Sequence, residues 1–314
     1  MFQPVTSLRR AALPRAAAPT LATATANATA ATAATLATAT ALALALAGCG
    51  SQPRDPHAAN TTAPLTTSTG AQAAATPALP DRAAQNAAVA RFAAAGKPIF
   101  CGAGTQRLVA LTFDDGPGPY TRIMLRQLRE AGAHATFFLV GRSVLRFPQW
   151  PARERELAAI GNHTMTHADL DAIDPAAAEK EIADGRATVL QAAGAPVDLF
   201  RPPYGRHNAR VDEQARSQGM AEILWDVDSA DSRVSPPAMF HEIAARVRRN
   251  ARPGSIVLMH ENRGQTIRAV RAILPALERR RLRLVTVPEL LAADPPSAAQ
   301  LAKGRRGCRA TQQP

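Results

Sequence analysis

The chain has 314 residues and a formal net charge of +12, and aromatic residues make up only 4% of it. Residues 11 to about 96 are dominated by Ala, Thr and Pro, so this stretch cannot bury enough apolar surface to fold alone, and we expect one globular domain of roughly 190 residues after it. A basic surface can suit nucleic acid, anionic lipid or an acidic wall polymer, but no nucleic-acid motif accompanies the charge. We therefore expect a solvated basic surface and no nucleic-acid partner.

The N-terminal segment has the pattern of a secretory signal. Basic residues up to Arg15 precede a stretch without charges that ends in Leu-Ala-Gly-Cys at Cys49. This ending resembles a bacterial lipobox, in which the cysteine becomes the lipidated first residue of the mature protein. We expect a lipoprotein signal over 1–48 and a lipid on Cys49 that holds the chain on a membrane. An ordinary signal peptide or an uncleaved anchor is the alternative.

The composition divides the rest of the chain into three parts. Residues 49–100 are expected to be a flexible tether rich in Ala, Thr and Pro. The globular domain is expected over 101–293, and a basic tail over 294–314. This organisation predicts a monomer in the bacterial cell envelope, with its domain in the periplasm or outside the cell.

Within the domain, short apolar segments alternate with helical patterns. Strands are predicted at 107–113, 135–140, 161–163, 199–200, 222–227, 255–259 and 282–287. Helices are predicted at 120–131, 154–160, 174–194, 208–218 and 266–279, with a further helix that begins at Ser235. About seven strand–helix units indicate an α/β fold with a parallel sheet that either closes as a barrel or stays open.

Polar residues stand where these predicted strands end. In parallel barrels the chemistry collects at the carboxyl ends of the strands. The predicted strand ends carry Asp114 with Asp115, His163, Arg201, Asp228 and His260. The sequence therefore predicts a functional site at one rim of the sheet.

The first two of these motifs predict a metal site. His163 and His167 are four residues apart, close enough to bind one ion from a helical turn or a tight loop. With one carboxylate from Asp114 or Asp115 they form a three-ligand set that leaves a position open for water, as hydrolytic zinc sites need. The other carboxylate is then free to act as a base on that water. Alone, the paired Asp residues would be read as turn formers and the His pair as a surface coincidence.

Three further motifs complete the pattern: Arg201-Pro202-Pro203-Tyr204-Gly205, Asp228-Ser229-Ala230-Asp231 and Leu258-Met259-His260. Together with the paired Asp and paired His motifs, they make the chain resemble the polysaccharide deacetylase family (carbohydrate esterase family four, the chitooligosaccharide deacetylase homology domain). The resemblance covers about 106–293. It implies a distorted (β/α)7 barrel that removes acetyl groups from N-acetylated sugars.

The resemblance also implies a metal triad and a base. Asp115, His163 and His167 look like the ligands of a divalent metal, usually Zn²⁺ in this family. Asp114 is similar to the general base, and Arg201 to the residue that orients it by charge-assisted pairing. A purely structural ion pair is the alternative for Arg201.

Further roles follow from the same resemblance. His260 looks like the general acid that protonates the departing amine, with Asp231 as its carboxylate partner. The backbone N–H of Tyr204 would help to hold the tetrahedral oxyanion. Trp225 and Leu258 would wall the pocket for the acetyl methyl group or the sugar, although packing explains a Trp in a strand about as well.

One position departs from the family pattern. The family usually has Trp straight after the second Asp of the fourth motif, whereas this chain has Ser232. That Trp lines the substrate groove, so the catalytic groups are kept while the shape of the groove is put in doubt. The remaining histidines of the domain, His134, His207 and His241, are interpreted as surface or loop residues without a role.

The two cysteines after Cys49 bracket the predicted domain. In a closed barrel the two ends of the chain lie near each other, so we expect a disulfide between Cys101 and Cys308 in an oxidising compartment. Two unpaired thiols are the alternative.

The leading hypothesis is a metal-dependent deacetylase of an extracytoplasmic N-acetylglucosamine polymer, which could be peptidoglycan, an exopolysaccharide or a chitin-like oligomer. The same site could remove O-acetyl groups from a polymer such as acetylxylan. The alternative from another class is a non-catalytic, metal-assisted glycan-binding protein, of which Ser232 would be a mark.

Overall fold

The computed structural model describes residues 78–233 and 237–312. The expected signal, the expected lipidation site Cys49 and most of the expected tether lie outside these ranges. Across the two ranges, no helix combines the length and the apolar character that crossing a membrane requires.

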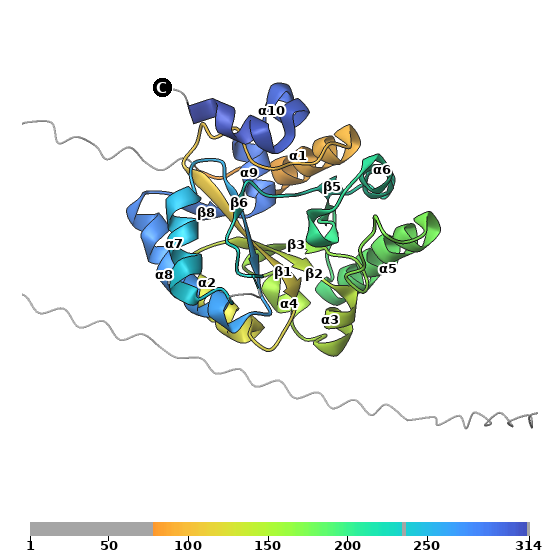
Figure 1. Ribbon diagram of the computed structural model, residues 1–314, viewed down its shortest axis with the longest axis horizontal. Helices are drawn as coiled ribbons and strands as arrows, with labels where there is room; N and C mark the ends of the chain where they lie inside the picture. The colour runs from red at the N-terminus through yellow and green to blue at the C-terminus, as the bar shows by residue number, and fades with distance from the viewer. Residues whose placement is uncertain (1–77, 234–236, 313–314) are drawn as a thin grey trace, which may run out of the picture. The chain divides into compact units, whose positions relative to one another are not determined.

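A curled parallel sheet forms the centre of the domain, and helices surround it (Figure 1). Its strands follow the spatial order β5-β4-β3-β2-β1-β7-β6, and β8 pairs with the start of β1. The strands are β1 (Leu108–Gly116), β2 (Ala135–Leu139), β3 (Ala158–Asn162), β4 (Leu199–Phe200), β5 (Ala221–Glu222), β6 (Val227–Asp228), β7 (Ile256–His260) and β8 (Arg283–Val285). This arrangement confirms the expected α/β class and the distorted (β/α) barrel.

Residues on the two faces of β1 belong to two different apolar clusters. Val109, Leu111 and Phe113 pack on one side, and Leu108 and Ala110 on the other, as the two-residue period of a strand requires. Both faces are buried, which explains why the central strands read as continuous apolar runs.

The helices that cover the sheet largely follow the predicted pattern. Asp174 caps α5 by accepting hydrogen bonds from the backbone N–H groups of Ala176 and Ala177, and the helix ends at Gly194 with φ 62°. The main helices are α2 (Thr121–Glu130), α5 (Pro175–Ala193), α6 (Ala209–Ser217), α7 (Phe240–Asn250) and α8 (Gly264–Arg279). Two short helices, α3 (Gly141–Arg146) and α4 (Pro151–Glu154), were not predicted.

Two predicted elements are wrong. The helix expected over 154–160 does not form: the unpredicted helix α4 already ends at Glu154, and β3 starts at Ala158 and pairs with β2 from Ala135 onward. The strand expected over 222–227 is interrupted. Its first part, β5, pairs with β4, whereas its second part, β6, pairs with β7. The chain thus crosses from one edge of the sheet to the other, which gives the barrel its irregular seam. The start of α7 also differs, since it begins at Phe240 and the expected cap Ser235 lies outside the described residues.

The domain begins before residue 101, so the last part of the expected tether is folded. Helix α1 (Arg82–Ala95) buries Val89 and Phe92 and packs against α9 (Val287–Ala293). The backbone of Ile99 then bonds to that of Glu222 and Leu224 at the seam. The Ala-rich composition had suggested a tether, but Ala is the strongest helix former, and a few apolar residues on one face suffice to dock such a helix.

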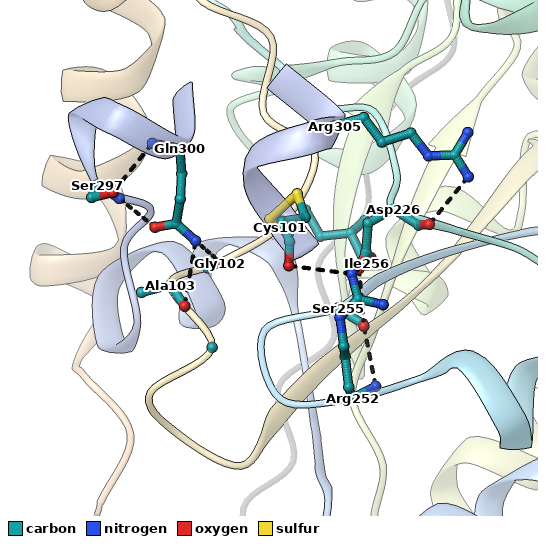
Figure 2. The surroundings of a disulfide bond; sticks show 12 residues. Cys101, Gly102, Ala103, Asp226, Arg252, Ser255, Ile256, Ser297, Gln300 and Arg305 are labelled. Atoms are coloured by element: carbon teal, nitrogen blue, oxygen red, sulfur yellow. Dashed lines mark hydrogen bonds and ion pairs between the residues drawn. A yellow bond between two sulfur atoms is a disulfide. The ribbon is translucent and has the colours of Figure 1, made fainter. Parts of the chain in front are cut away.

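The expected basic tail is also folded over its described part. It forms α10 (Ala298–Lys303) and a 3₁₀ segment, Gly304–Gln312. The structure joins Cys308 to Cys101 by a disulfide, with their Cα atoms 5.9 Å apart. Figure 2 shows this bond beside Arg305, which donates to the backbone carbonyl of Asp226, and near Gln300, which reaches the carbonyls of Gly102 and Ala103.

Candidate active site

The two carboxylates that end β1 approach the same imidazole. Neighbouring residues of a regular strand point to opposite faces. Here the register between β1 and β2 shifts between Asp114 and Gly116, and Asp115 has φ 71°, in the left-handed region. As a result, Asp114 Oδ2 lies 3.7 Å and Asp115 Oδ1 lies 3.8 Å from His163 Nε2.

Asp115, His163 and His167 form a cluster in which one ligand-type atom from each lies within 4.8 Å of the others. The Nε2 atom of His167 is 3.3 Å from Asp115 Oδ1. A tight loop brings the two imidazoles together, since Thr164 and His167 both have φ 66° and the hydroxyl of Thr164 accepts a hydrogen bond from the His167 N–H. The sequence had left open a helical turn or a loop, and the structure has a loop.

The cluster fits a metal ion. Asp115 Oδ1 is buried and has no hydrogen-bond partner among the described residues, whereas its Oδ2 accepts from Asn262. His163 Nδ1 lies 2.7 Å from the carbonyl oxygen of Arg201, which fixes the proton on Nδ1 and leaves Nε2 as a free ligand atom. Burial, and next the charge of His163, lower the pKa of His167, which favours the neutral imidazole that a metal needs.

Arg201 fixes the position of Asp114. The guanidinium is completely buried, and its Nη1 lies 2.7 Å from Asp114 Oδ1. It also donates to the Thr112 hydroxyl and to the backbone carbonyls of Ile223 and Leu224. These contacts fix the guanidinium, and its charge-assisted hydrogen bond fixes one oxygen of the Asp114 carboxyl group.

His260 and Asp231 form a second fixed pair. Asp231 Oδ1 lies 2.7 Å from His260 Nδ1, and its Oδ2 accepts hydrogen bonds from the His260 N–H and the Thr266 hydroxyl. Burial alone would lower the pKa of His260, but the hydrogen bond and charge of Asp231, with the charges of Asp114 and Asp115, raise it to about 9. The imidazole is therefore set to carry a proton near neutral pH.

The two pairs stand side by side. Asp114 on β1 is directly opposite His260 on β7, so the sheet register itself places the Arg201–Asp114 pair next to the His260–Asp231 pair. All four residues lie at the carboxyl ends of parallel strands or in the loops that follow.

Three expected pocket residues differ in exposure. Tyr204 has φ 62°, is 63% exposed, and its ring lies 4.7 Å from that of His167. Trp225 is half-buried in the segment between β5 and β6, where Gly205 packs against its ring. Leu258 is buried in β7 and pairs with Thr112 of β1, and Ser232 is exposed.

Sequence reasoning missed three supporting residues. The Thr112 hydroxyl accepts a hydrogen bond from Arg201. Asn262 donates one to Asp115, and Thr266 donates one to Asp231. Thr112 precedes the paired Asp residues by two positions, and Asn262 follows His260 by two, so their place near strand ends was a usable signal. Thr266 lies in the first turn of α8, and no local pattern marks it.

Comparisons with known proteins point in one direction. A family model described as polysaccharide deacetylase matches residues 102–223. A peptidoglycan-N-acetylglucosamine deacetylase of Bacillus cereus is 38% identical over 191 residues, which cover 59% of this chain and 89% of the relative. A chitooligosaccharide deacetylase of Rhizobium leguminosarum bv. trifolii is 34% identical over 200 residues, which cover 58% of this chain and 91% of the relative.

A solved structure is similar as well. The crystal structure of a peptidoglycan N-acetylglucosamine deacetylase in complex with 4-naphthalen-1-yl-N-oxidanyl-benzamide matches with a TM-score of 0.59 at 30% identity. The match covers 64% of this chain and 95% of that structure.

Proposed function

The chain belongs to the polysaccharide deacetylase family and is a hydrolase, and we propose that it removes acetyl groups from an N-acetylglucosamine-containing polysaccharide with the help of a divalent metal ion. The named activities of its relatives support peptidoglycan or a chitin-like oligomer as the substrate. An acetylated exopolysaccharide has the same reacting group.

Asp115, His163 and His167 would hold the metal, with Zn²⁺ as the expected ion. The unpartnered Oδ1 of Asp115 and the oriented Nε2 of His163 support this assignment. When bound, such an ion acidifies a water molecule and stabilises negative charge on the substrate oxygen.

Asp114 is proposed as the general base. Its Oδ1 is occupied by Arg201, so its other oxygen, on the side of His163, is available to accept a proton from water. Arg201 acts as a positioning residue, because it fixes one oxygen of the carboxylate.

His260 is proposed as the general acid. Asp231 binds the proton on Nδ1, so the proton on Nε2 is the one that can pass to the departing amine. An amine is a poor leaving group, and without this proton the carbon–nitrogen bond would not break readily.

Substrate contacts are proposed for three residues. The backbone N–H of Tyr204 would donate to the oxyanion. The exposed ring of Tyr204, the half-buried Trp225 and the buried Leu258 would bound the sugar and acetyl group. Exposed Ser232 leaves this part of the groove more open than a Trp would.

The pairing of Asp114 with His260 across β1 and β7 is the observation that carries this proposal. It brings a fixed base and a fixed acid beside the Asp115, His163 and His167 ligand group. The test is acetate release from N-acetylglucosamine oligomers, peptidoglycan and acetylated xylan by the zinc-loaded chain. Release from the first two is expected. Release from xylan alone would indicate O-deacetylation, and binding of glycan without any release would indicate a non-catalytic protein.

We also propose that the domain acts as a monomer outside the cytoplasm, on a lipid anchor at Cys49. The charge-free segment ending in Leu-Ala-Gly-Cys and the Cys101–Cys308 disulfide support this location. Cells that express the chain should incorporate labelled fatty acid into it and keep it in the membrane fraction. Cys49→Ala should abolish the label, and label that persists would contradict the anchor.

A further inference from the structure

A second group of ligand-type side chains lies outside the active site. An imidazole nitrogen of His207 and one carboxylate oxygen each from Asp212 and Glu222 lie within 4.8 Å of one another. The three come from different elements: His207 from the loop before α6, Asp212 from the first turn of α6, and Glu222 from the end of β5. No sequence motif connects the three, and His207 by its pattern alone is a loop residue without a role.

Glu222 is the unusual member of the group. The residue is only 5% exposed, and no N–H or O–H donor of the described residues reaches its carboxylate oxygens, which lie against the carboxyl group of Asp212. Buried carboxylates are almost always paired, hydrogen-bonded or bound to a metal.

His207 does not satisfy both acids. Its Nδ1 lies 3.1 Å from Asp212 Oδ1, a hydrogen-bond distance, but 3.8 Å from Glu222 Oε1, which is too far for a hydrogen bond. No Lys or Arg of the described ranges forms an ion pair with Glu222. A cation between the three side chains would supply the missing partner.

We propose that His207, Asp212 and Glu222 bind a second divalent transition-metal ion, separate from the one at Asp115, His163 and His167. One imidazole and two carboxylates suit ions such as Zn²⁺ or Mn²⁺ better than Mg²⁺ or Ca²⁺, which prefer oxygen ligands alone. Two carboxylates also balance the charge of a divalent cation. His207 is exposed, so an ion can reach the site from solvent.

The second ion would act as a clamp. His207 belongs to the loop that carries Tyr204, whereas Glu222 belongs to the sheet, so the ion ties this loop and α6 to β5. The inference concerns binding and stability, and it does not depend on the proposed reaction.

The test is the zinc content of metal-stripped protein brought to equilibrium with micromolar Zn²⁺. Wild type should bind two ions. Glu222→Gln keeps the shape of the side chain but removes its charge, and His207→Ala removes the nitrogen, so each should bind one. The matched control is Glu213→Gln, which neutralises an exposed acid of α6 paired with Arg216 and should keep two. One ion in wild type, or two ions in Glu222→Gln, would overturn the proposal.

A second test measures the melting temperature of the Asp115→Asn variant, in which the first metal site has lost one of its ligands. In that background, Zn²⁺ should still raise the melting temperature, and Mg²⁺ should not. Adding Glu222→Gln should weaken the apparent zinc affinity by at least about tenfold and remove the rise, while circular dichroism reports that the metal-free variants remain folded. An equal rise with and without Glu222→Gln would contradict a second site.

Discussion

At the scale of single residues, the site depends on partners that leave each functional group only one free atom. Arg201 occupies one oxygen of Asp114, the Arg201 carbonyl occupies Nδ1 of His163, and Asp231 occupies Nδ1 of His260. What remains free are a carboxylate oxygen and two Nε2 atoms. The supporting contacts therefore determine which atom can bind, accept or donate.

Asp114→Asn should remove turnover without removing the metal. The amide keeps the shape of the carboxylate and can still contact Arg201, but it cannot accept a proton from water. We expect kcat to fall by about 10²- to 10⁴-fold, the usual contribution of a general base. Acetate release gives kcat, and elemental analysis of the same sample gives zinc content. Turnover close to wild type with the metal bound would assign the base elsewhere.

Asp231→Asn should move the alkaline limb of the pH–rate profile to lower pH. The acid must be protonated to act, so activity is lost as pH rises through the pKa of His260. The hydrogen bond and charge of Asp231 raise that pKa against the opposing effect of burial, so their loss in the neutral amide should lower it. The profile of kcat/KM between about pH 6 and pH 10 checks the shift.

Thr266→Val is the matched control for this variant. It removes a hydrogen bond to Asp231 but keeps both charges, so it should shift the limb much less. An unchanged limb in Asp231→Asn would mean that another group supplies the proton.

The sequence identified the charged residues of the site but not all of their supports. Asp115, His163 and His260 stand at strand ends and have side chains with few other uses there. Thr266 and Asn262 are neutral and common on surfaces. Their contacts with Asp231 and Asp115 depend on how α8 and the end of β7 lie against β1 and β6, which no local pattern encodes.

At the scale of elements, interrupted pairing is the feature that periodicity cannot detect. Residues 222–227 are apolar enough to read as one strand, but Trp225 and Asp226 lie between two short pieces that pair at opposite edges. The carboxylate of Asp226 accepts the Ile256 N–H and pairs with Arg252, so a side chain replaces part of the backbone ladder. Strands with an uninterrupted run of pairs, such as β7 along β1, were predicted well.

Helix α1 should contribute to the stability of the domain. Phe92 is 5% exposed and packs in the same apolar cluster as Ile99 and Leu290. Phe92→Ala should lower the free energy of unfolding by about 3 kcal/mol, measured by urea denaturation. Asn86→Ala, at an exposed position of the same helix, should change it by less than about 0.5 kcal/mol. Equal effects of the two substitutions would mean that α1 does not stabilise the domain and belongs to the tether.

At the scale of the whole described domain, the segments at its two ends complete the barrel. The backbone of Ile99 bonds to the end of β5, and Gly102 bonds to the carbonyl of Gly254 just before β7. The disulfide then joins this segment to Cys308, which is 207 residues away in sequence. The sequence predicted the pairing because a closed barrel brings its ends together, but the order of 298–312 follows from contacts that composition does not reveal.

A buried pair of acids, Glu154 and Glu261, lies next to the candidate active site. Glu154, at the end of α4, and Glu261, directly after His260, are both completely buried. Thr121 donates a hydrogen bond to Glu261, and Gly116 makes room for it, because a Cβ on this glycine would lie 1.8 Å from Glu261 Oε2. Burial raises the pKa of Glu261 to about 7 and, with the charge of Glu261, raises that of Glu154 well above its ordinary value.

This pair should make the domain less stable as the pH rises. A carboxyl group with a raised pKa in the folded state binds more protons there than in the unfolded state. Its stabilising contribution is therefore complete below the unfolded pKa and is lost as pH rises through about 7. Between about pH 5 and pH 8, at constant zinc, the free energy of unfolding should fall by an amount on the order of 2 kcal/mol.

Glu154→Gln should flatten this dependence, because the amide cannot ionise and the raised pKa of Glu154 no longer contributes, whereas burial still raises the pKa of Glu261. Glu156→Gln is the control, since Glu156 is exposed and pairs only loosely with Arg129, and it should keep the wild-type slope. Parallel curves for wild type and Glu154→Gln would show that the two acids do not share their protonation. A flatter curve would mean that folding of the domain takes up a proton at Glu154, one member of this buried pair of acids.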